Sequence, residues 1–288
     1  MLPPLLKETL RVEPPLVALS PVVYDSPHSG RTYPMDFDHA IDLSVLRQAE
    51  DTHVEALFAH VPQLGSPLLY ALMPRTYIDV NRAIEEFDTE MLDGPWELPV
   101  VPTEATGQGI GLIWRHVGID GPIYARKLKP EEVLRRIFYC WKPYHERLGQ
   151  LIDQAHERFG VSYHVNCHSM PSRPEGACDD SRAPRVDFVL GDRDGTTSEG
   201  DFVRLVRDTL RELGYQVKVN DPYKGAELLR RFADPAAGRH SLQIEINRRL
   251  YMDETTRARN GFFTKLTRDL EHLTRTIADY ALERAGQG

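Results

Sequence analysis

Two histidines stand in short polar motifs that each follow an apolar, β-rich run. His28 lies in Ser-Pro-His-Ser-Gly after the run 16–23, and His168 lies in Asn-Cys-His-Ser-Met after the run 161–165. In open α/β sheets, ligand sites form at the carboxyl ends of strands, where such motifs lie. For His28 alone, the structural alternative is a side chain that caps the next segment.

Two imidazoles and one carboxylate are a common zinc ligand set, which leaves a fourth position for water. The candidate carboxylates are Glu50 and Asp51, in a stretch whose apolar spacing predicts a helix from Leu43 to His60. No compact motif such as His-Glu-x-x-His fixes the local geometry. The spacing therefore leaves both acids open as the third ligand.

A further acid, Glu245, interrupts the apolar run 242–246. Burying a carboxylate without a partner is unfavourable, so its position needs an explanation. Glu245 either forms an ion pair with Arg248 or Arg249, or it accepts a proton from water as a general base.

A predicted strand at 77–80 is flanked by Arg75, Asn81 and Arg82. Arginine can hold a carboxylate through two parallel hydrogen bonds, which makes these residues candidates for binding an acidic ligand. The structural alternative is an ion pair between Asp79 and Arg82.

Strands and helices alternate along the chain, which predicts an α/β fold with helices on both faces of a central sheet. Besides the runs named above, strands are predicted at 186–190 and 215–219. Further helices are predicted at 130–159, 200–213 and 262–282. Residues 93–122 are predicted to form a long irregular loop. No stretch with the composition of a linker divides residues 1–288, so we expect a single domain.

Composition excludes several classes of protein. The formal net charge of -8 gives no electrostatic reason to bind nucleic acid, and no run of about 18 apolar residues predicts a membrane span. The three cysteines, Cys140, Cys167 and Cys178, are an odd number at unrelated spacings, which predicts a cytoplasmic protein. Cys167 and His168 are adjacent in a predicted strand and point to opposite faces, which argues against a cysteine hydrolase.

Eight short motifs, in their order along the chain, resemble the N-formylglutamate amidohydrolase family. The resemblance runs from about Val17 to Glu254. The motifs are Ser26 to Arg31, Glu50-Asp51, Asp79 to Arg82, Pro143 to His145, Cys167 to Pro171, Leu190 to Arg193, Asn220 to Gly225 and Leu242 to Arg248. The family is distantly similar to zinc carboxypeptidases and aspartoacylase. The resemblance thus implies a three-layer α/β/α fold with a central mixed sheet, phosphorylase/hydrolase-like, around a zinc carboxypeptidase-like core.

The resemblance also implies roles for individual residues. His28 and His168 match the two histidine ligands of a Zn²⁺ ion. Related carboxypeptidases have a glutamate where Arg31 stands here. The carboxylate ligand is therefore expected elsewhere, with Asp51 as the first choice and Glu50 as the second.

Glu245 matches the base that takes a proton from water, and Arg75 matches the arginine that polarises the scissile carbonyl. An acidic substrate also needs cationic and polar anchors. Those expected in this chain are Asn81, Arg82, Arg230 and Arg248.

The implied reaction is zinc-dependent hydrolysis of N-formyl-L-glutamate to L-glutamate and formate, in histidine degradation. Another divalent metal is an alternative to zinc. The predicted partner is a small-molecule N-acyl amino acid, and the sequence predicts no oligomeric state. A hydrolase for a different N-acyl amino acid or acyl-amine, and a non-catalytic protein that binds an acidic ligand, are the alternatives.

Two positions depart from the family pattern. Asn166 stands where the family often has aspartate, which is expected to alter the support of the neighbouring ligand His168. The sequence Gly225-Ala226-Glu227 replaces a Gly-Gly-Tyr-like turn near the expected side-chain pocket. Strict specificity for formylglutamate is therefore left open.

Overall fold

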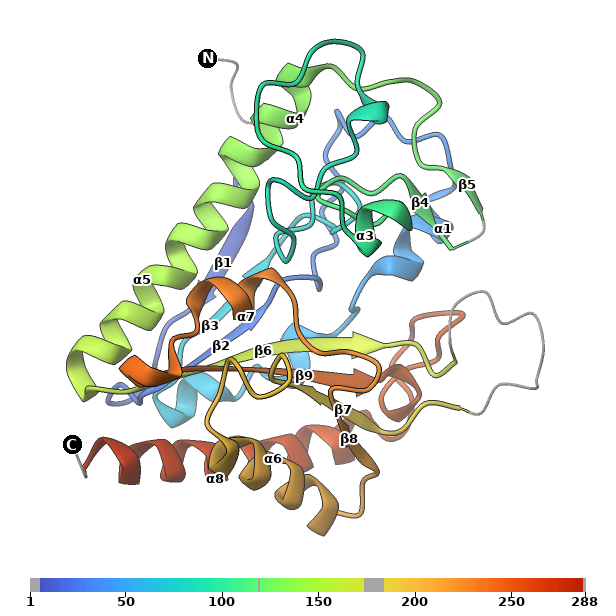
Figure 1. Ribbon diagram of the computed structural model, residues 1–288. Coiled ribbons are helices and arrows are strands. Elements are labelled where there is room, and N and C mark those ends of the chain that lie inside the picture. Colours follow the sequence, from blue (N-terminus) through green and yellow to red (C-terminus); the bar gives the residue numbers. More distant parts are fainter. Residues whose placement is uncertain (1–5, 119, 174–183, 287–288) are drawn as a thin grey trace. The chain divides into compact units, whose positions relative to one another are not determined.

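The computed structural model describes residues 6–118, 120–173 and 184–286, so Cys178 lies outside the described residues. Its main sheet has seven strands in the order β1-β3-β2-β6-β9-β7-β8 (Figure 1). The strands are β1 Leu10–Glu13, β2 Val22–Ser26, β3 Leu68–Ala71, β6 Ser162–Met170, β7 Phe188–Gly191, β8 Val217–Val219 and β9 Arg239–Asn247. A second, two-stranded sheet pairs β4 His116–Val117 with β5 Asp120–Pro122.

The sheet is mixed, as expected. Strands β2, β6 and β9 run parallel, whereas β7 is antiparallel to β9 and parallel to β8. In the register of β6 with β9, Asn166 lies opposite Gln243 and His168 lies opposite Glu245. The carboxyl ends of parallel strands meet at one edge of a sheet, so the sheet brings together polar residues that are far apart in the sequence.

The α-helices are α1 Leu43–Leu46, α2 Val54–Leu57, α3 Glu104–Gly107, α4 Pro130–Arg136, α5 Lys142–Phe159, α6 Gly200–Glu212, α7 Glu227–Phe232 and α8 Phe263–Ala285. The chain divides into two compact units. The first comprises Met1–Arg11, Pro27–Glu50 and Tyr70–Arg147, and the second Val12–Ser26, Asp51–Leu69 and Leu148–Gly288. Each unit is built from three stretches, so no single linker separates them, and the expected one-domain organisation stays a prediction.

In the second unit, α6 and α8 cover one face of the sheet and α7 lies on the other (Figure 1), which is the expected α/β/α layering. Tyr163 of β6 packs against Phe202 of α6 and Tyr280 of α8, with ring centroids 4.8 and 5.8 Å apart. Side chains alternate between the two faces of a strand. Tyr163, Val165 and Cys167 therefore form its apolar face, and His164, Asn166 and His168 point to the opposite face.

The first unit has its own aromatic core, built around a buried arginine. The Arg136 guanidinium lies over the Tyr77 ring, 4.0 Å from its centroid, and donates hydrogen bonds to the Tyr77 carbonyl and the Tyr124 hydroxyl. Phe37 packs edge-on against Tyr77. These contacts stabilise a buried positive charge, since aromatic faces attract cations.

Most elements predicted from the sequence are confirmed with shifted ends. The predicted strands at 161–165, 186–190, 215–219 and 242–246 correspond to β6, β7, β8 and β9, and the helices at 130–159, 200–213 and 262–282 to α4 with α5, α6 and α8. The first predicted strand, 16–23, is displaced to β2. The loop 93–122 contains the short helix α3 and both strands of the small sheet.

Two predicted elements are wrong. Residues 77–80 form turns instead of a strand, because their backbone groups bond to side chains and to a loop: the Val80 carbonyl contacts the His145 ring, and the Asp79 amide donates to the Leu112 carbonyl. The predicted helix 43–60 is broken after Ala49, and His53 has a positive φ of 72°. Asp51 consequently lies in a non-helical stretch.

Candidate active site

One part of the site is built on the carboxyl end of β6, within the second unit. His168 is 3% exposed, and its Nδ1 lies 3.1 Å from Asp51 Oδ2. The other oxygen of Asp51 accepts a hydrogen bond from Arg248 Nη2 at 3.1 Å, and Arg248 Nε donates to Ser169 Oγ. Burial lowers the pKa of Arg248, but the charge and hydrogen bond of Asp51, together with Tyr251 and Glu254, raise it, and the net effect is a raised pKa.

A second part is built in the first unit, around His28 and Asp79. His28 lies two residues after β2, and its Nε2 is 2.7 Å from Asp79 Oδ1. Asp79 Oδ2 accepts two hydrogen bonds from Arg75, at 3.1 and 3.0 Å, and one from Trp114 Nε1. Burial alone would raise the pKa of Asp79, yet the charges of His28 and Arg75 hold it well below its usual range. Nε2 is thus the ring nitrogen of His28 that contacts Asp79.

The turn that carries His28 has little room. A Cβ atom at Gly30 would lie 2.1 Å from the Met73 carbonyl oxygen, closer than any van der Waals contact allows. Glycine is therefore required here because two backbone segments approach each other closely.

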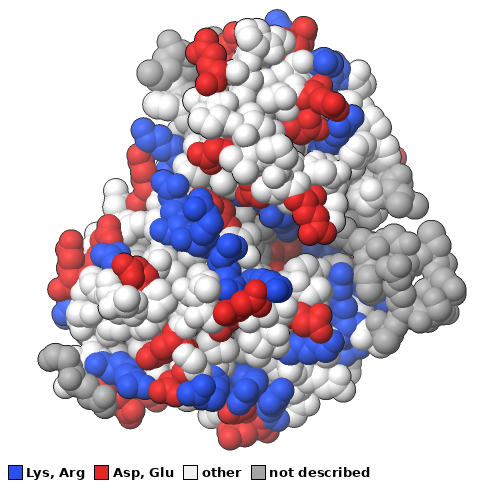
Figure 2. All heavy atoms as spheres, in the orientation of Figure 1, with Lys and Arg blue, Asp and Glu red and all other residues white. Residues whose placement is uncertain are grey.

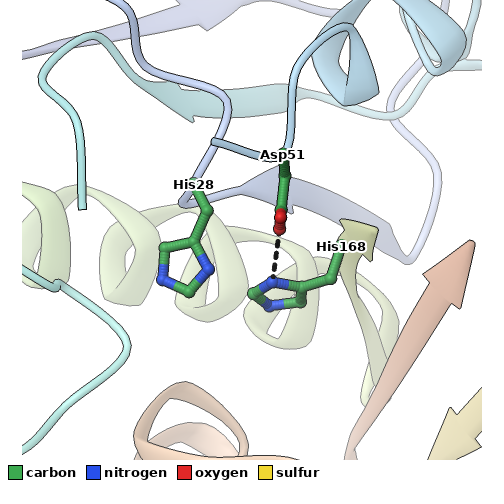
Figure 3. Close-up of side chains that lie close together, drawn as sticks. All are labelled: His28, Asp51 and His168. Atoms are coloured by element: carbon green, nitrogen blue, oxygen red, sulfur yellow. Dashed lines mark hydrogen bonds and ion pairs between the residues drawn. The ribbon is translucent and has the colours of Figure 1, made fainter. Parts of the chain in front are cut away.

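His28, Asp51 and His168 form a buried group whose ligand atoms all lie within 4.8 Å of one another (Figure 3). The group offers two imidazole nitrogens and one carboxylate oxygen, the donor set of catalytic zinc sites that keep a position open. These are the three ligands expected from the sequence and the resemblance. By the chemistry of its donors, the group fits a divalent metal ion.

Glu50, the second choice for the carboxylate ligand, is engaged elsewhere in its unit. Its Oε1 accepts hydrogen bonds from the Tyr33 hydroxyl at 2.9 Å and from Arg47 Nε at 3.2 Å. Asp51, by contrast, belongs to the group that can hold a metal. The geometry thus favours Asp51.

Glu245 lies opposite His168 in the parallel register of β6 and β9, and its side chain is buried. Gln243 Nε2 donates to its Oε1 at 3.0 Å. The two arginines considered as ion-pair partners pair with other acids: Arg248 with Asp51, and Arg249 with Asp187 at 2.7 Å.

The residues expected to bind the substrate are placed in different surroundings. Asn81 is buried and donates its backbone N–H to Asp79, while Arg82 lies 3.9 Å from Glu86. The ion pair of Asp79 is formed with Arg75. Arg230, on α7, pairs with Glu227, while Arg248 contacts Asp51 as described.

Cys167 does not fit a nucleophile. It is fully buried, and burial raises the pKa of its thiol well above the usual range. It belongs to the apolar face of β6, opposite His168, as the sequence indicated. A nucleophilic cysteine needs an accessible thiolate, which this environment disfavours.

Sequence reasoning missed several side chains that support the site. Asp79 as the partner of His28, and Arg248 as the partner of Asp51, cannot be inferred from spacing. A signal did exist for the polar face of the sheet, because polar residues alternate in two strands. They are His164, Asn166 and His168 in β6, and Ser241, Gln243 and Glu245 in β9.

The distribution of charged side chains and the hydropathy of the helices bear on the expectations from composition. On the face drawn in Figure 2, basic and acidic side chains are interspersed. Among the residues that the structure describes, no helix is both long enough and apolar enough to span a membrane.

Known proteins resemble this chain over most of its length. A crystal structure of N-formylglutamate amidohydrolase from Ralstonia eutropha JMP134 shares 48% sequence identity, with a TM-score of 0.90, and covers 96% of this chain and 99% of that chain. N-formylglutamate deformylases from Pseudomonas putida and Pseudomonas aeruginosa are 26% and 27% identical over 244 residues. These matches cover 82% and 81% of this chain and 83% of each relative.

Fold and relatives together define the class of the protein: it is an amidohydrolase with an α/β fold, and it acts on a linear amide bond. The N-formylglutamate amidohydrolase family matches residues 20–252. The chain belongs to this family, and the resemblance found in its motifs is confirmed.

Proposed function

We propose that this protein hydrolyses N-formyl-L-glutamate to L-glutamate and formate, with Zn²⁺ as its cofactor. The observation that carries this proposal is the buried group of His28, Asp51 and His168, together with the family membership. The names of the relatives support the substrate. A role in histidine degradation is proposed on the family resemblance alone, and a cytoplasmic location on the odd number of cysteines at unrelated spacings.

The ion would be held by the two imidazoles and the Asp51 carboxylate. Bound zinc supplies a Lewis acid that polarises a carbonyl and lowers the pKa of water from 15.7 toward about 7. Imidazole and carboxylate also suit other divalent transition metals, so the donor set does not select zinc alone.

Glu245 would take the proton from the attacking water and return it to the nitrogen of the leaving amine. Two observations support this assignment. Glu245 lies opposite His168 in the strand register, and Arg248 and Arg249 form ion pairs with Asp51 and Asp187. A general base must lie within hydrogen-bond reach of the proton it abstracts, and β9 places Glu245 on the polar face of the sheet beside the ligand His168.

Arg75 would contact the scissile carbonyl oxygen, and Asn81 and Arg82 would bind a carboxylate of the substrate. The hydrogen bonds that Asp79 makes with Arg75 and with the Asn81 backbone support this arrangement, because they fix both residues in one turn of the first unit. Arg230 and Arg248 remain further candidates for the second carboxylate, although Arg248 is engaged with Asp51.

Metal analysis joined to a formate-release assay tests the proposal. The purified wild-type protein is expected to contain one zinc ion per chain and to release formate from N-formyl-L-glutamate faster than from other N-formyl or N-acetyl amino acids. His168→Ala should lose both metal and activity, because one of three protein ligands is gone.

Two matched variants identify the carboxylate ligand. Asp51→Asn should lose metal, whereas Glu50→Gln should keep it. Stoichiometric zinc in His168→Ala, or loss of zinc only in Glu50→Gln, would show that the ligand assignment is wrong. Zinc binding without any hydrolysis would instead favour a protein that only binds an acidic ligand.

A further inference from the structure

A chain of buried hydrogen bonds runs across the polar face of the sheet and ends at His168. It lies entirely within the second unit and involves side chains of β2, β6 and β9. Asp25 lies opposite Asn166 in the parallel register of β2 with β6, and Ser241 lies opposite His164 in the register of β6 with β9. These four residues and His168 are at most 3% exposed.

The contacts are short and continuous. Ser241 Oγ lies 3.1 Å from His164 Nδ1, and His164 Nε2 lies 2.9 Å from Asp25 Oδ1. The same oxygen accepts a hydrogen bond of 2.6 Å from Asn166 Nδ2. Asn166 Oδ1 then lies 2.7 Å from His168 Nε2. The hydrogen bonds thus connect Ser241, in the middle of the sheet, to His168, which belongs to the group that can hold a metal.

The direction of the last two hydrogen bonds follows from the chemistry of the groups. An ionised carboxylate can only accept, so Asp25 requires the NH₂ group of Asn166 to point toward it. The amide oxygen of Asn166 then faces His168, and an amide oxygen can only accept a hydrogen bond. The hydrogen must therefore be on His168 Nε2, which leaves the lone pair of Nδ1 on the side of Asp51.

We propose that Asp25 and Asn166 are positioning residues that fix the ring of His168 with hydrogen on Nε2 and with Nδ1 presented to the metal. This inference rests on the proposed function, because it assigns the support of one ligand of the proposed zinc site. Side chains that hold a ligating histidine through its second nitrogen typically contribute about 10–100-fold to metal affinity. Here the carboxylate is Asp25 on β2, and Asn166 lies between it and His168.

This arrangement explains how Asn166, which departs from the family pattern, can support His168. With aspartate in place of Asn166, the acceptor for His168 would itself carry the charge. In this chain the carboxyl group is that of Asp25, and Asn166 lies between it and the histidine.

Zinc affinity measured by competition with a chromophoric chelator tests the inference. Asn166→Ala removes the acceptor of the Nε2 hydrogen, and we expect its zinc Kd to rise about 10–100-fold. The double variant Asp25→Asn/Asn166→Asp exchanges amide and carboxylate but keeps one anion and one acceptor for His168. It should recover most of the affinity, since the Ser241 hydroxyl can donate or accept and lets His164 adapt.

Cys167→Ala is the matched control, because it changes a buried residue of the same strand on the opposite face. It should lower the thermal midpoint without changing the zinc Kd. Nuclear magnetic resonance of zinc-loaded wild type provides a readout that needs no variant: the hydrogen of the His168 ring should be on Nε2.

Several outcomes would overturn the inference. These are a hydrogen on Nδ1, an unchanged Kd in Asn166→Ala, or equal losses of affinity in Asn166→Ala and the double variant. If only these fail while wild type binds zinc and releases formate, the proposed function stands. If wild type binds no zinc, both the proposed function and the inference are wrong.

Discussion

At the scale of the residue, the buried carboxylates of the site differ in what surrounds them. Asp79 accepts hydrogen bonds from a guanidinium, an indole and a backbone amide, besides its contact with His28. Such contacts stabilise the charged form of a buried acid. Glu245 accepts a hydrogen bond from the neutral side-chain amide of Gln243. Hydrogen bonds from charged donors are stronger than those from neutral donors.

The role of Glu245 is tested by Glu245→Gln, which hardly changes the side-chain volume. As a general base its loss should lower kcat by about 10²–10⁴, because the amide cannot accept the proton from water. Zinc content and thermal midpoint should persist. An active but strongly destabilised variant would mean that Glu245 is structural, since breaking a buried ion pair costs about 3–5 kcal/mol. All three quantities are measured on one preparation.

Arg82 allows a second test at this scale. A contact with a substrate carboxylate that does not react stabilises the ground state and the transition state alike. Arg82→Lys keeps the charge but loses the two parallel hydrogen bonds, so KM should rise more than kcat falls. Steady-state kinetics on N-formyl-L-glutamate measure both. A loss confined to kcat would place Arg82 at the reacting carbonyl.

At the scale of the element, β6 has two different faces. His164, Asn166 and His168 belong to the polar chain on one face, and Tyr163 packs against α6 and α8 on the other. Polar groups in the middle of a buried strand are tolerated only when they are hydrogen-bonded, as His164 and Asn166 are. The strand therefore serves the core on one side and the site on the other.

The free energy of unfolding should depend on pH through His240, which lies on the apolar face of the sheet. Its ring stacks on Tyr163, 4.9 Å between centroids, and its Nδ1 accepts a hydrogen bond from the backbone N–H of Glu199, which precedes α6. Burial lowers the pKa of His240, against the opposing charge of Glu199. The neutral ring is thus favoured in the folded state.

A lowered histidine pKa contributes stability above the unfolded value of about 6.5, and this contribution is lost as the pH falls through the folded pKa. Wild type should therefore lose more free energy of unfolding between about pH 7 and 5 than His240→Gln does. Denaturant titrations across this range measure the difference. Parallel curves would show that His240 does not favour the neutral form. His60, whose pKa burial also lowers, contributes equally to both proteins.

At the scale of the whole molecule, the three proposed ligands come from stretches that are widely separated in the sequence. A metal that binds only the folded protein stabilises it by about 2.7 kcal/mol when its concentration is 100 times the Kd. Removing zinc with a chelator should therefore lower the thermal midpoint, and added zinc should restore it. His168→Ala should show no zinc-dependent change. A wild-type midpoint that is independent of zinc would contradict the proposed site.

The sequence by itself determined the α/β class, most strands and helices, and the two histidines at strand ends. These features depend on local patterns: apolar runs that end in polar turns, and apolar spacings of three and four residues. Their order along the chain was also enough to indicate the family, because eight motifs in one order constrain the comparison far more than any one motif.

Only the tertiary structure brings Asp51, and not Glu50, into one group with His28 and His168. The position of Asp51 depends on a break in a stretch whose apolar spacing predicts a helix. It also depends on a hydrogen bond from Arg248, which directly follows β9. The turns at 77–80 are likewise fixed by His145 and by a loop carbonyl distant in the sequence. Local propensity differs little between such alternatives, and long-range hydrogen bonds in a buried environment, where an unpaired polar group is costly, select one of them.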